Sequence, residues 1–223
     1  MKAAFYDGNN NMEIKEHPDP VPKAGEVLVD IKSTGICGSD LNMNKAKNSA
    51  DQDPAGHEVA GEIIDIGEGV DKQFIGKRIA LEVLGSGKSC NLCWFCRHGQ
   101  YTHCSDKKGS SSGGFAEYIT RKVGGCYELS DQMTWDEGAL VEPLAVSIHG
   151  VRIGGLKGGE SVAILGSGNI GLTAVAAARA LGAGKIFVTS RHKQQSDMAK
   201  ELGADYAATS EGDEFEQLIL DKT

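Results

Sequence analysis

The segment GKSCNLCWFCRHGQYTHCSD, residues 87–106, contains four of the chain's six cysteines: Cys90, Cys93, Cys96 and Cys104. The sequence shows no signal peptide and no apolar run of membrane length, so we expect the chain in the cytosol. Clustered thiols can form disulfides, but disulfides rarely persist in the cytosol. Clustered thiols can also hold an iron–sulfur cluster, and the first three follow the spacing C-x2-C-x2-C. The fourth comes after seven further residues, however, and Ser105 follows it where ferredoxins have proline.

A four-thiolate zinc site is the interpretation that this spacing favours, because such sites accept loops of varied length between their ligands. Four protein ligands fill the coordination shell of zinc, so this metal would stabilise the loop and perform no chemistry. If the protein has a reaction centre, we expect it elsewhere in the chain.

A glycine turn forms the second pattern. The stretch VAILGSGNIGL, residues 162–172, places Gly166, Gly168 and Gly171 in the order G-x-G-x-x-G, directly after an apolar strand and directly before a helix. In that context the motif indicates dinucleotide binding: the first glycine allows a tight turn, the second admits the pyrophosphate, and the third lets helix and strand pack closely. Backbone N–H groups at the helix start, at Asn169 and Ile170, would receive the phosphates. An ordinary glycine turn is the alternative.

A third set of chemically suited residues is scattered along the chain. Cys37 lies in STGICGSD, His57 and Glu58 lie in PAGHEVAGE, and Glu142 lies in VEPLAVSIHG. Thiolate, imidazole and carboxylate are all zinc ligands. Each residue also has an ordinary explanation, as a buried cysteine, a hydrogen-bonded histidine or a solvated glutamate. Spacing alone does not decide between these interpretations.

The composition narrows the class of protein. A formal net charge of −8 argues against nonspecific binding to nucleic acid or to anionic membranes. Few Lys or Arg residues accompany the cysteine cluster, which disfavours a zinc-ribbon module that binds nucleic acid.

The elements that must position these residues fall into two parts. Short alternating stretches predict strands at residues 2–6, 12–16, 26–32, 58–66 and 78–83, with a polar loop at 42–53 and a connector at 109–114. From Trp135 the spacing becomes helical, with Pro143 at a helix break or start. Strands predicted at 161–165, 185–190 and 206–208 then alternate with helices at 170–181, 193–202 and 213–220. This alternation predicts a parallel α/β unit.

The motifs together resemble one family. ICGSD, GHEVAGEI, the four-cysteine segment, GGFAEY, EPLAVSIHG and the glycine turn occur in the order typical of zinc-dependent medium-chain dehydrogenases. EPLAVSIHG is most similar to the polyol branch, which includes sorbitol, idonate, butanediol and galactitol-phosphate dehydrogenases. The resemblance covers almost the whole chain. It implies a GroES-like β-barrel catalytic domain followed by a Rossmann domain, with the active site in the cleft between them.

The resemblance also implies roles for the scattered residues. Cys37 and His57 would be direct ligands of a catalytic zinc, and Glu58 and Glu142 would complete the shell, directly or through water. Ser39 takes the position of a hydroxyl that passes the substrate's proton outward. Many members have a histidine three residues further on, where this chain has Asn42. Because an amide does not titrate, the outer proton path would differ here.

The implied function is that of an oxidoreductase. Zinc lowers the pKa of the bound alcohol, Ser39 accepts the proton, and a hydride passes to the nicotinamide of NADP or NAD. The expected substrate is a small-molecule polyol or secondary alcohol. The alternative is a zinc-stabilised nucleotide-binding relative or fragment without dehydrogenase activity, which the presence of all four catalytic-zinc positions disfavours.

The choice of dinucleotide depends on the second strand of the Rossmann unit. Its sequence KIFVTS ends at Ser190, nineteen residues beyond Gly171, and Arg191 follows. An NAD site needs an acid near this point for the ribose 2′-hydroxyl. A hydroxyl and a guanidinium instead suit a 2′-phosphate, and His192 and Lys193 add positive charge. We predict a preference for NADP over NAD; ordinary surface bases at a strand end are the alternative.

The predicted domains are a catalytic domain at 1–148, with a structural zinc lobe at about 85–107, and a partial Rossmann domain at 149–223. A dinucleotide fold needs two mononucleotide halves, and residues after 160 leave room for one. We therefore expect a C-terminally incomplete chain that is by itself a poor catalyst with an unprotected sheet edge. At full length we expect a cytoplasmic homo-oligomer.

Overall fold

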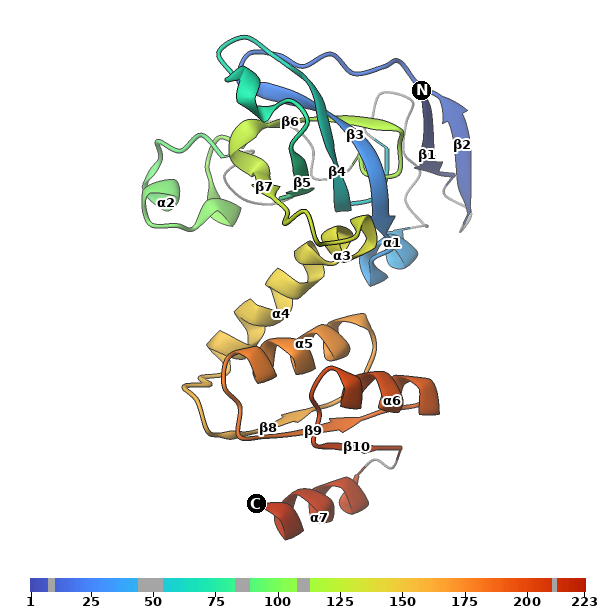
Figure 1. Cartoon of the computed structure of the whole chain (residues 1–223), viewed down its shortest axis with the longest axis vertical. Helices are drawn as coiled ribbons and strands as arrows, with labels where there is room; N and C mark the ends of the chain where they lie inside the picture. Colours follow the sequence, from blue (N-terminus) through green and yellow to red (C-terminus); the bar gives the residue numbers. More distant parts are fainter. Residues whose placement is uncertain (8–10, 44–53, 83–88, 108–112, 210–211) are drawn as a thin grey trace. The chain divides into compact units, whose positions relative to one another are not determined.

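The structure is a computed structural model that describes residues 1–7, 11–43, 54–82, 89–107, 113–209 and 212–223 (Figure 1). The chain forms two compact units, Met1–Glu142 and Pro143–Thr223. The division falls six residues before the predicted boundary at 148, inside helix α4 (Val141–Ile153). Most of the polar loop at 42–53 and of the connector at 109–114 lies outside the described residues.

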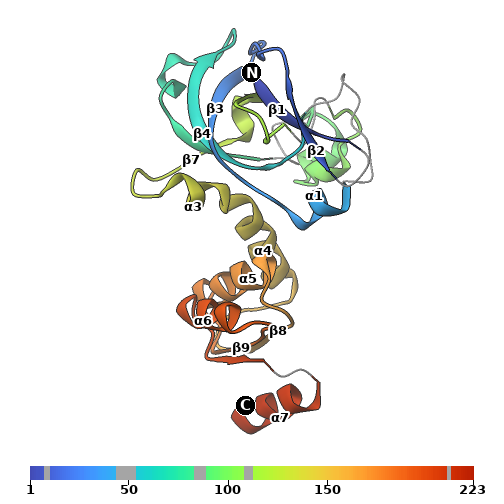
Figure 2. The same ribbon diagram turned by 90° about the vertical axis from the view of Figure 1, so that its right-hand side faces the viewer.

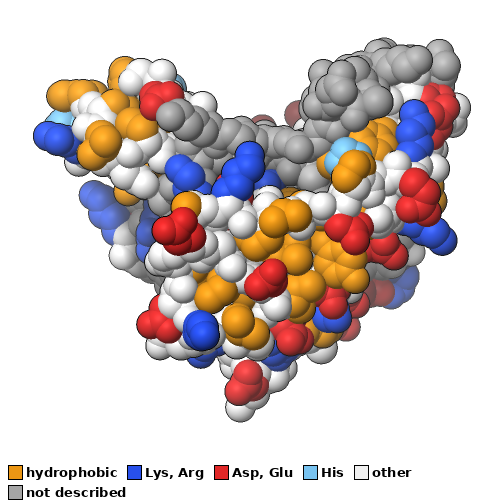
Figure 3. Space-filling view, turned by 90° about the horizontal axis from the view of Figure 1, so that it is seen from above, with side chains coloured by type: hydrophobic (Ala, Val, Ile, Leu, Met, Phe, Trp, Pro, Cys, Tyr) orange, Lys and Arg blue, Asp and Glu red, His pale blue; other side chains and the backbone are white. Residues whose placement is uncertain are grey.

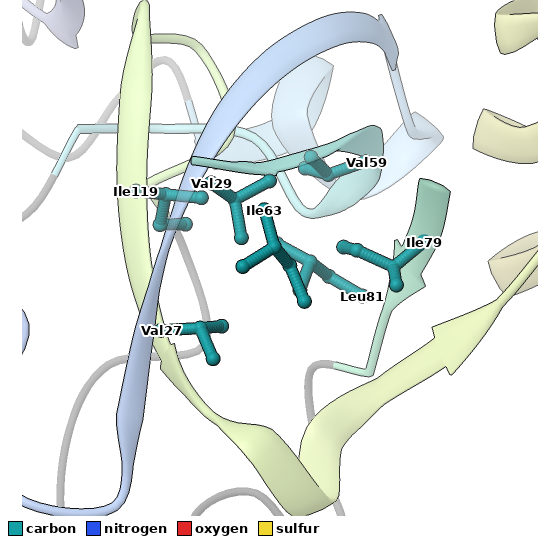
Figure 4. Packing of buried hydrophobic residues seen from close by; sticks show 7 residues of the cluster. All are labelled: Val27, Val29, Val59, Ile63, Ile79, Leu81 and Ile119. Atoms are coloured by element: carbon teal, nitrogen blue, oxygen red, sulfur yellow. The ribbon is translucent and has the colours of Figure 1, made fainter. Parts of the chain in front are cut away.

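An antiparallel sheet of five strands forms the centre of the first unit. Its strand order is β6-β3-β4-β5-β7, built from Tyr118–Lys122, Glu26–Gly35, Glu58–Ile66, Arg78–Leu81 and Cys126–Glu128. Alternating apolar side chains of these strands form the core shown in Figure 4: Val27, Val29, Val59, Ile63, Ile79, Leu81 and Ile119. Each of them is at most 5% exposed, so their burial supplies much of the unit's stability.

A second sheet pairs β1 (Lys2–Tyr6) with β2 (Met12–Glu16), and a bridge from Ala3 to Ala116 connects β1 to the rest of the unit. The sequence predicted both of these strands with the observed bounds. It did not predict β6 and β7, which are short and mixed in polarity, or the helix α1 (Gly38–Met43) that follows β3.

The pairing of β3 with β4 matters most for the chemistry of this unit. The two strands run antiparallel, with Thr34 opposite Val59 and Gly35 opposite Glu58. Strand β3 therefore ends where β4 begins, and the chain on either side of this point carries Cys37 and His57. The sequence placed the end of β3 at residue 32, three residues short of Gly35.

The cysteine-rich segment is a loop beside the sheet, with little regular structure of its own (Figure 1). It contains one helical turn, α2 (Trp94–Arg97), and one 3-10 turn, η2 (Tyr101–His103). Further along, helix α3 (Trp135–Ala139) starts at a capping box in which Thr134 and Glu137 satisfy each other's backbone N–H groups. This helix packs on β3 and β4 and begins the helical region that the sequence predicted.

The second unit is a three-stranded parallel sheet with helices on both sides. The strand order is β10-β9-β8, from Tyr206–Ala208, Lys185–Thr189 and Ser161–Ile164. Figures 1 and 2 show α5 (Asn169–Ala180) and α6 (Lys193–Glu201) on one side of this sheet and α7 (Asp213–Lys222) on the other. This is the parallel α/β arrangement that the sequence predicted.

Among the described residues, no helix is long and apolar enough to cross a membrane. Figure 3 shows Asp and Glu side chains interspersed with Lys and Arg over one face of the molecule.

Candidate metal centres and nucleotide-binding turn

The four clustered cysteines converge on one point. The Sγ atoms of Cys90, Cys93, Cys96 and Cys104 all lie within 4.8 Å of one another. Backbone N–H groups donate to Cys90 and Cys104: Leu92 and Cys93 donate to Cys90 Sγ at 3.4 and 3.3 Å, and Asp106 donates to Cys104 Sγ at 3.4 Å. Such donors stabilise a thiolate, which is the form that binds metal.

The acidity of these thiols follows from their surroundings. Backbone N–H donation, first from Cys96 and then from Ser105, lowers the pKa of Cys93 to about 5. The N–H of Cys90 lowers the pKa of Cys104. Burial raises the pKa of Cys96 to about 12, so this thiol loses its proton only when a cation compensates its charge. The donor set therefore fits a divalent metal, and four thiolates suit zinc.

A second group of ligand atoms forms where β3 and β4 meet. The thiol of Cys37, the imidazole of His57 and the carboxylate of Glu58 lie within 4.8 Å of one another. Cys37 and His57 are partly exposed, whereas Glu58 is only 2% exposed. Two strands that are distant in sequence thus bring together sulfur, nitrogen and oxygen donors, with one side open to solvent. This donor set also fits zinc and leaves room for a further ligand.

Asp40 contacts two members of this group, the backbone of Cys37 and the imidazole of His57. Its Oδ2 accepts a hydrogen bond from the N–H of Cys37 at 2.8 Å, and its Oδ1 lies 3.6 Å from His57 Nδ1. The hydroxyl of Tyr6, on β1, donates to the same Oδ1 at 2.8 Å. Asp40 is 4% exposed, so this carboxylate is a buried anchor that orients a cysteine and a histidine together.

The sequence reasoning did not identify Asp40 or Tyr6. The motif ICGSD contains Asp40, and a carboxylate three residues after a candidate ligand was a usable signal. Tyr6 gave none, because its contact with Asp40 spans 34 residues.

The two glutamates of the predicted set differ in position. Burial raises the pKa of Glu58, opposed by the charge of His57 and by a hydrogen bond with Cys37. Burial also raises the pKa of Glu142, and the charges of His57 and Glu58 act on it. The charge of His57 thus acts on both carboxyls, but within the described part of the chain only Glu58 joins Cys37 and His57 in the 4.8 Å group. Ser39 is exposed in the first turn of α1, and Asn42 lies later in the same helix.

The glycine turn has the form that its sequence predicted. Gly166 has φ +94°, a conformation that side-chain-bearing residues rarely adopt. A Cβ on Gly171 would overlap the carbonyl of Gly166, so α5 can approach the turn only because this residue is glycine. Around Gly168 a Cβ would meet nothing within 4 Å, which leaves space in front of the start of α5, where Asn169 and Ile170 form its first turn.

Hydroxyl groups surround this turn. Thr189, the last residue of β9, accepts a hydrogen bond from the N–H of Gly166 at 2.8 Å. Ser167 and Ser190 are each 2% exposed, and their Oγ atoms have no hydrogen-bond partner among the described residues. Arg191, next to Ser190, is exposed. Two buried hydroxyls without a protein partner, beside an open helix start, fit a phosphate-bearing ligand.

Comparison with known proteins identifies the family to which this architecture belongs. Residues 23–131 match the alcohol dehydrogenase GroES-like domain, and residues 169–223 match the zinc-binding dehydrogenase domain. The chain is 30% identical to (R,R)-butanediol dehydrogenase of Bacillus subtilis (strain 168), an alignment that covers 100% of this chain and 67% of the relative. The chain belongs to the zinc-dependent alcohol dehydrogenase family. The predicted fold class, a GroES-like domain followed by a Rossmann-type parallel sheet, is thereby confirmed.

Further members of the family give the same picture. Sorbitol dehydrogenase of Bacillus subtilis (strain 168) is 37% identical over 92% of this chain and 60% of its own length. The crystal structure of galactitol-1-phosphate dehydrogenase from Escherichia coli superposes with a TM-score of 0.83 at 33% identity, over 100% of this chain and 65% of the other. The chain thus spans about 60% of the length of the sorbitol dehydrogenase that it matches.

Two similar structures hold nicotinamide cofactors. A zinc-binding dehydrogenase of Sinorhizobium meliloti 1021 bound to NADP has a TM-score of 0.80 at 32% identity, over 93% of this chain and 61% of the other. An alcohol dehydrogenase of Escherichia coli CFT073 complexed with NADH has a TM-score of 0.84 at 28% identity, over 100% of this chain and 66% of the other.

Proposed function

We propose that this protein is a zinc-dependent oxidoreductase that transfers a hydride between a polyol or secondary alcohol and NADP or NAD. The observation that carries the proposal is the meeting of Cys37, His57 and Glu58 within 4.8 Å in a GroES-like unit. The names of the similar proteins, sorbitol, butanediol and galactitol-1-phosphate dehydrogenases, support a hydroxylated small molecule as substrate.

Two zinc ions per chain are part of the proposal. Cys90, Cys93, Cys96 and Cys104 would hold one, which stabilises the loop around α2. Cys37 and His57 would hold the other as direct ligands, with Glu58 as the nearer carboxylate and Glu142 as the outer one. When bound at this second site, zinc would supply a Lewis acid that lowers the pKa of an alcohol oxygen.

The chain's own groups would complete the chemistry. Asp40 holds the N–H of Cys37 and faces His57, so it keeps both donors directed at one point. The exposed hydroxyl of Ser39 would accept the proton of the substrate's hydroxyl group at its Oγ and pass it to solvent. The nicotinamide would accept the hydride. Because Asn42 cannot titrate, we propose that the proton leaves Ser39 through water.

A preference for NADP over NAD is the finer proposal on the cofactor. Gly166, Gly168 and Gly171, with the first turn of α5, would receive the pyrophosphate. The buried hydroxyl of Ser190 and the exposed guanidinium of Arg191 support binding of a 2′-phosphate. Lys193 contributes less to the local positive charge, because it pairs with Asp197 at 2.6 Å. One charge-assisted contact is worth about 1.5–3 kcal/mol, or about ten- to a hundredfold in affinity.

The cofactor proposal can be tested on this chain with two fragments of the dinucleotide. Calorimetry should show that adenosine 2′,5′-bisphosphate binds at least about tenfold more tightly than 5′-AMP, as one charge-assisted contact requires. The double variant Ser190→Asp with Arg191→Ala should reverse that order, because a carboxylate repels the 2′-phosphate and accepts from a free 2′-hydroxyl. Tighter binding of 5′-AMP by the wild type would refute the preference.

The reaction itself is best tested on a protein whose length matches that of these relatives. A panel of polyols and secondary alcohols, mixed with NADP or NAD, should give nicotinamide absorbance with at least one substrate, and Cys37→Ser should abolish it. No turnover with any member of the panel, from a protein that carries both metals, would contradict the proposed function. We further propose that the protein acts in the cytoplasm and that it forms a homo-oligomer. Light scattering on the purified protein would test the oligomeric state.

A further inference from the structure

Gly35 stands opposite Glu58 in the β3–β4 ladder, and its own conformation does not explain why it is glycine. Its φ is outside the positive range in which thirteen other glycines of the described chain lie. Gly35 is glycine because the structure leaves no space for a side chain at this position. A Cβ built on it would overlap Oε2 of Glu58 and would come within 3.1 and 3.2 Å of the Cβ and Cδ of that residue.

The carboxylate of Glu58 therefore occupies the volume that a side chain at position 35 would take. It is shielded from solvent, because Glu58 is 2% exposed. The thiol of Cys37, with which it forms a hydrogen bond, and the imidazole of His57 lie within 4.8 Å of it. The distance of the carboxylate from these two ligand atoms therefore depends on the free space above Gly35 that the carboxylate occupies.

We propose that Gly35 is a positioning residue for the metal centre: its missing side chain makes the recess that fixes the Glu58 carboxylate beside Cys37 and His57. The inference rests on the proposed metal site at these three residues. It adds a role for a residue that touches neither metal nor substrate and acts only through Glu58.

Gly35→Ala is the direct test. The overlapping atom is the terminal oxygen of a side chain, so the carboxylate gives way before the backbone does. We expect the chain to fold and the affinity of the Cys37 site for Zn²⁺ to fall about 10- to 100-fold, the usual effect of disturbing groups that orient metal ligands. Competition with a chromophoric chelator measures that affinity. Co²⁺ substitution at this site should show a changed thiolate-to-metal absorption band, whereas zinc at the four-cysteine site should be retained.

A mutant cycle separates the carboxylate from the strand. Asp at position 58 keeps the charge but withdraws the oxygen from the recess, so Gly35→Ala should cost less than about threefold in Zn²⁺ affinity in a Glu58→Asp background. Gln at position 58 keeps the shape, so in a Glu58→Gln background Gly35→Ala should still cost about 10- to 100-fold. Gly61→Ala is the matched fold control. Its Cβ would meet the backbone of Asp30 in the same ladder, and it should lower the melting temperature without selective loss of this metal.

The outcomes distinguish a failure of the proposed metal site from a failure of the proposed role of Gly35. Wild type without a metal at Cys37 and His57 would overturn the proposed metal site. Wild type with that metal, and Gly35→Ala with affinity within threefold of it, would overturn the role of Gly35. If Gly35→Ala fails to fold but Gly35→Ala with Glu58→Asp folds, the clash with Glu58 is confirmed as the cause. If neither folds, position 35 needs glycine for the backbone, and the inference is wrong.

Discussion

The two candidate metal sites of the first unit are built in opposite ways. The four-cysteine site takes all its ligands from one stretch of fifteen residues, with one helical turn, α2, and one 3-10 turn, η2, between them. The second site takes Cys37 from beyond the end of β3, His57 from the position before β4 and Glu58 from the first position of β4. It depends on the pairing of those strands. A metal at the first site would organise a loop with little other structure, whereas the second site is already organised by a buried core.

Backbone and side-chain groups contribute differently to the two sites. In the cysteine loop, main-chain N–H groups point at the sulfurs of Cys90 and Cys104. In the second site a side chain, Asp40, binds the main chain of Cys37 and faces His57. We infer that the metal stabilises the loop at the first site. At the second site the folded strands fix the positions of the ligands before the metal binds.

The largest effect is expected from removing one cysteine at each site. Cys93→Ser should lose one of two zinc ions and several kcal/mol of stability, since structural zinc contributes about 10–16 kcal/mol of binding free energy in small zinc domains. Cys37→Ser should also lose one zinc but destabilise the fold by less than about 2 kcal/mol, because the core of Val27, Ile63 and their neighbours remains. Elemental analysis and urea unfolding measure the two quantities.

Cys126 provides the control for that experiment. It lies outside both groups, so Cys126→Ser should keep two zinc ions. Equal loss of stability from Cys93→Ser and Cys37→Ser would contradict the contrast, as would loss of both metals from Cys37→Ser.

Thiol labelling against pH should separate the cysteines of the metal-free chain. Cys93, with a pKa lowered to about 5 by N–H donation, is already a thiolate at neutral pH, so its alkylation rate should be flat between about pH 6 and 9. Burial raises the pKa of Cys126 to about 12, so its rate should rise about tenfold per pH unit over the same range. Mass spectrometry after iodoacetamide pulses gives both profiles. Parallel profiles for the two thiols would show that the N–H groups do not act on Cys93.

Asp40→Asn should weaken the second site alone. Asn has one acceptor oxygen, but Asp40 accepts from both Cys37 N–H and Tyr6 O–H, so one donor would face an NH₂ group. Zn²⁺ affinity at the Cys37 site should fall about 10- to 100-fold, with the cysteine-loop zinc unchanged. An unchanged affinity at the Cys37 site would mean that β3 and β4 alone set the position of Cys37.

Tyr6→Phe is expected to have the smallest effect. It removes one hydrogen bond to a buried carboxylate and should cost about 1–2 kcal/mol of stability. Because Asp40 keeps its contact with Cys37, Zn²⁺ affinity should change less than it does in Asp40→Asn. A larger loss of metal than of stability would make Tyr6 part of the metal support.

Much of the fold was predictable, because alternation and helical spacing are local properties. The strands at 2–6, 12–16, 58–66 and 206–208 have their predicted bounds, and the helices of the second unit differ from prediction by at most two residues at either end. The short strands β6 and β7 were missed, since three to five residues of mixed polarity carry little pattern. The predicted loop at 42–53 lies mostly outside the described residues.

The candidate sites likewise differ in whether local sequence patterns could predict them. Spacing within one loop was enough to predict that Cys90, Cys93, Cys96 and Cys104 would meet, and three glycines between a strand and a helix were enough to predict a tight turn there. Tyr6 and Gly35 had no such signal, because their roles come from contacts with residues that are distant in sequence. Strand β3 is three residues longer than predicted and ends at Gly35, not at residue 32. The added residues place Gly35 opposite Glu58 and so determine the position of the Glu58 carboxylate. A side chain's neighbours across a sheet depend on register, and register is set by how whole strands bury their apolar faces.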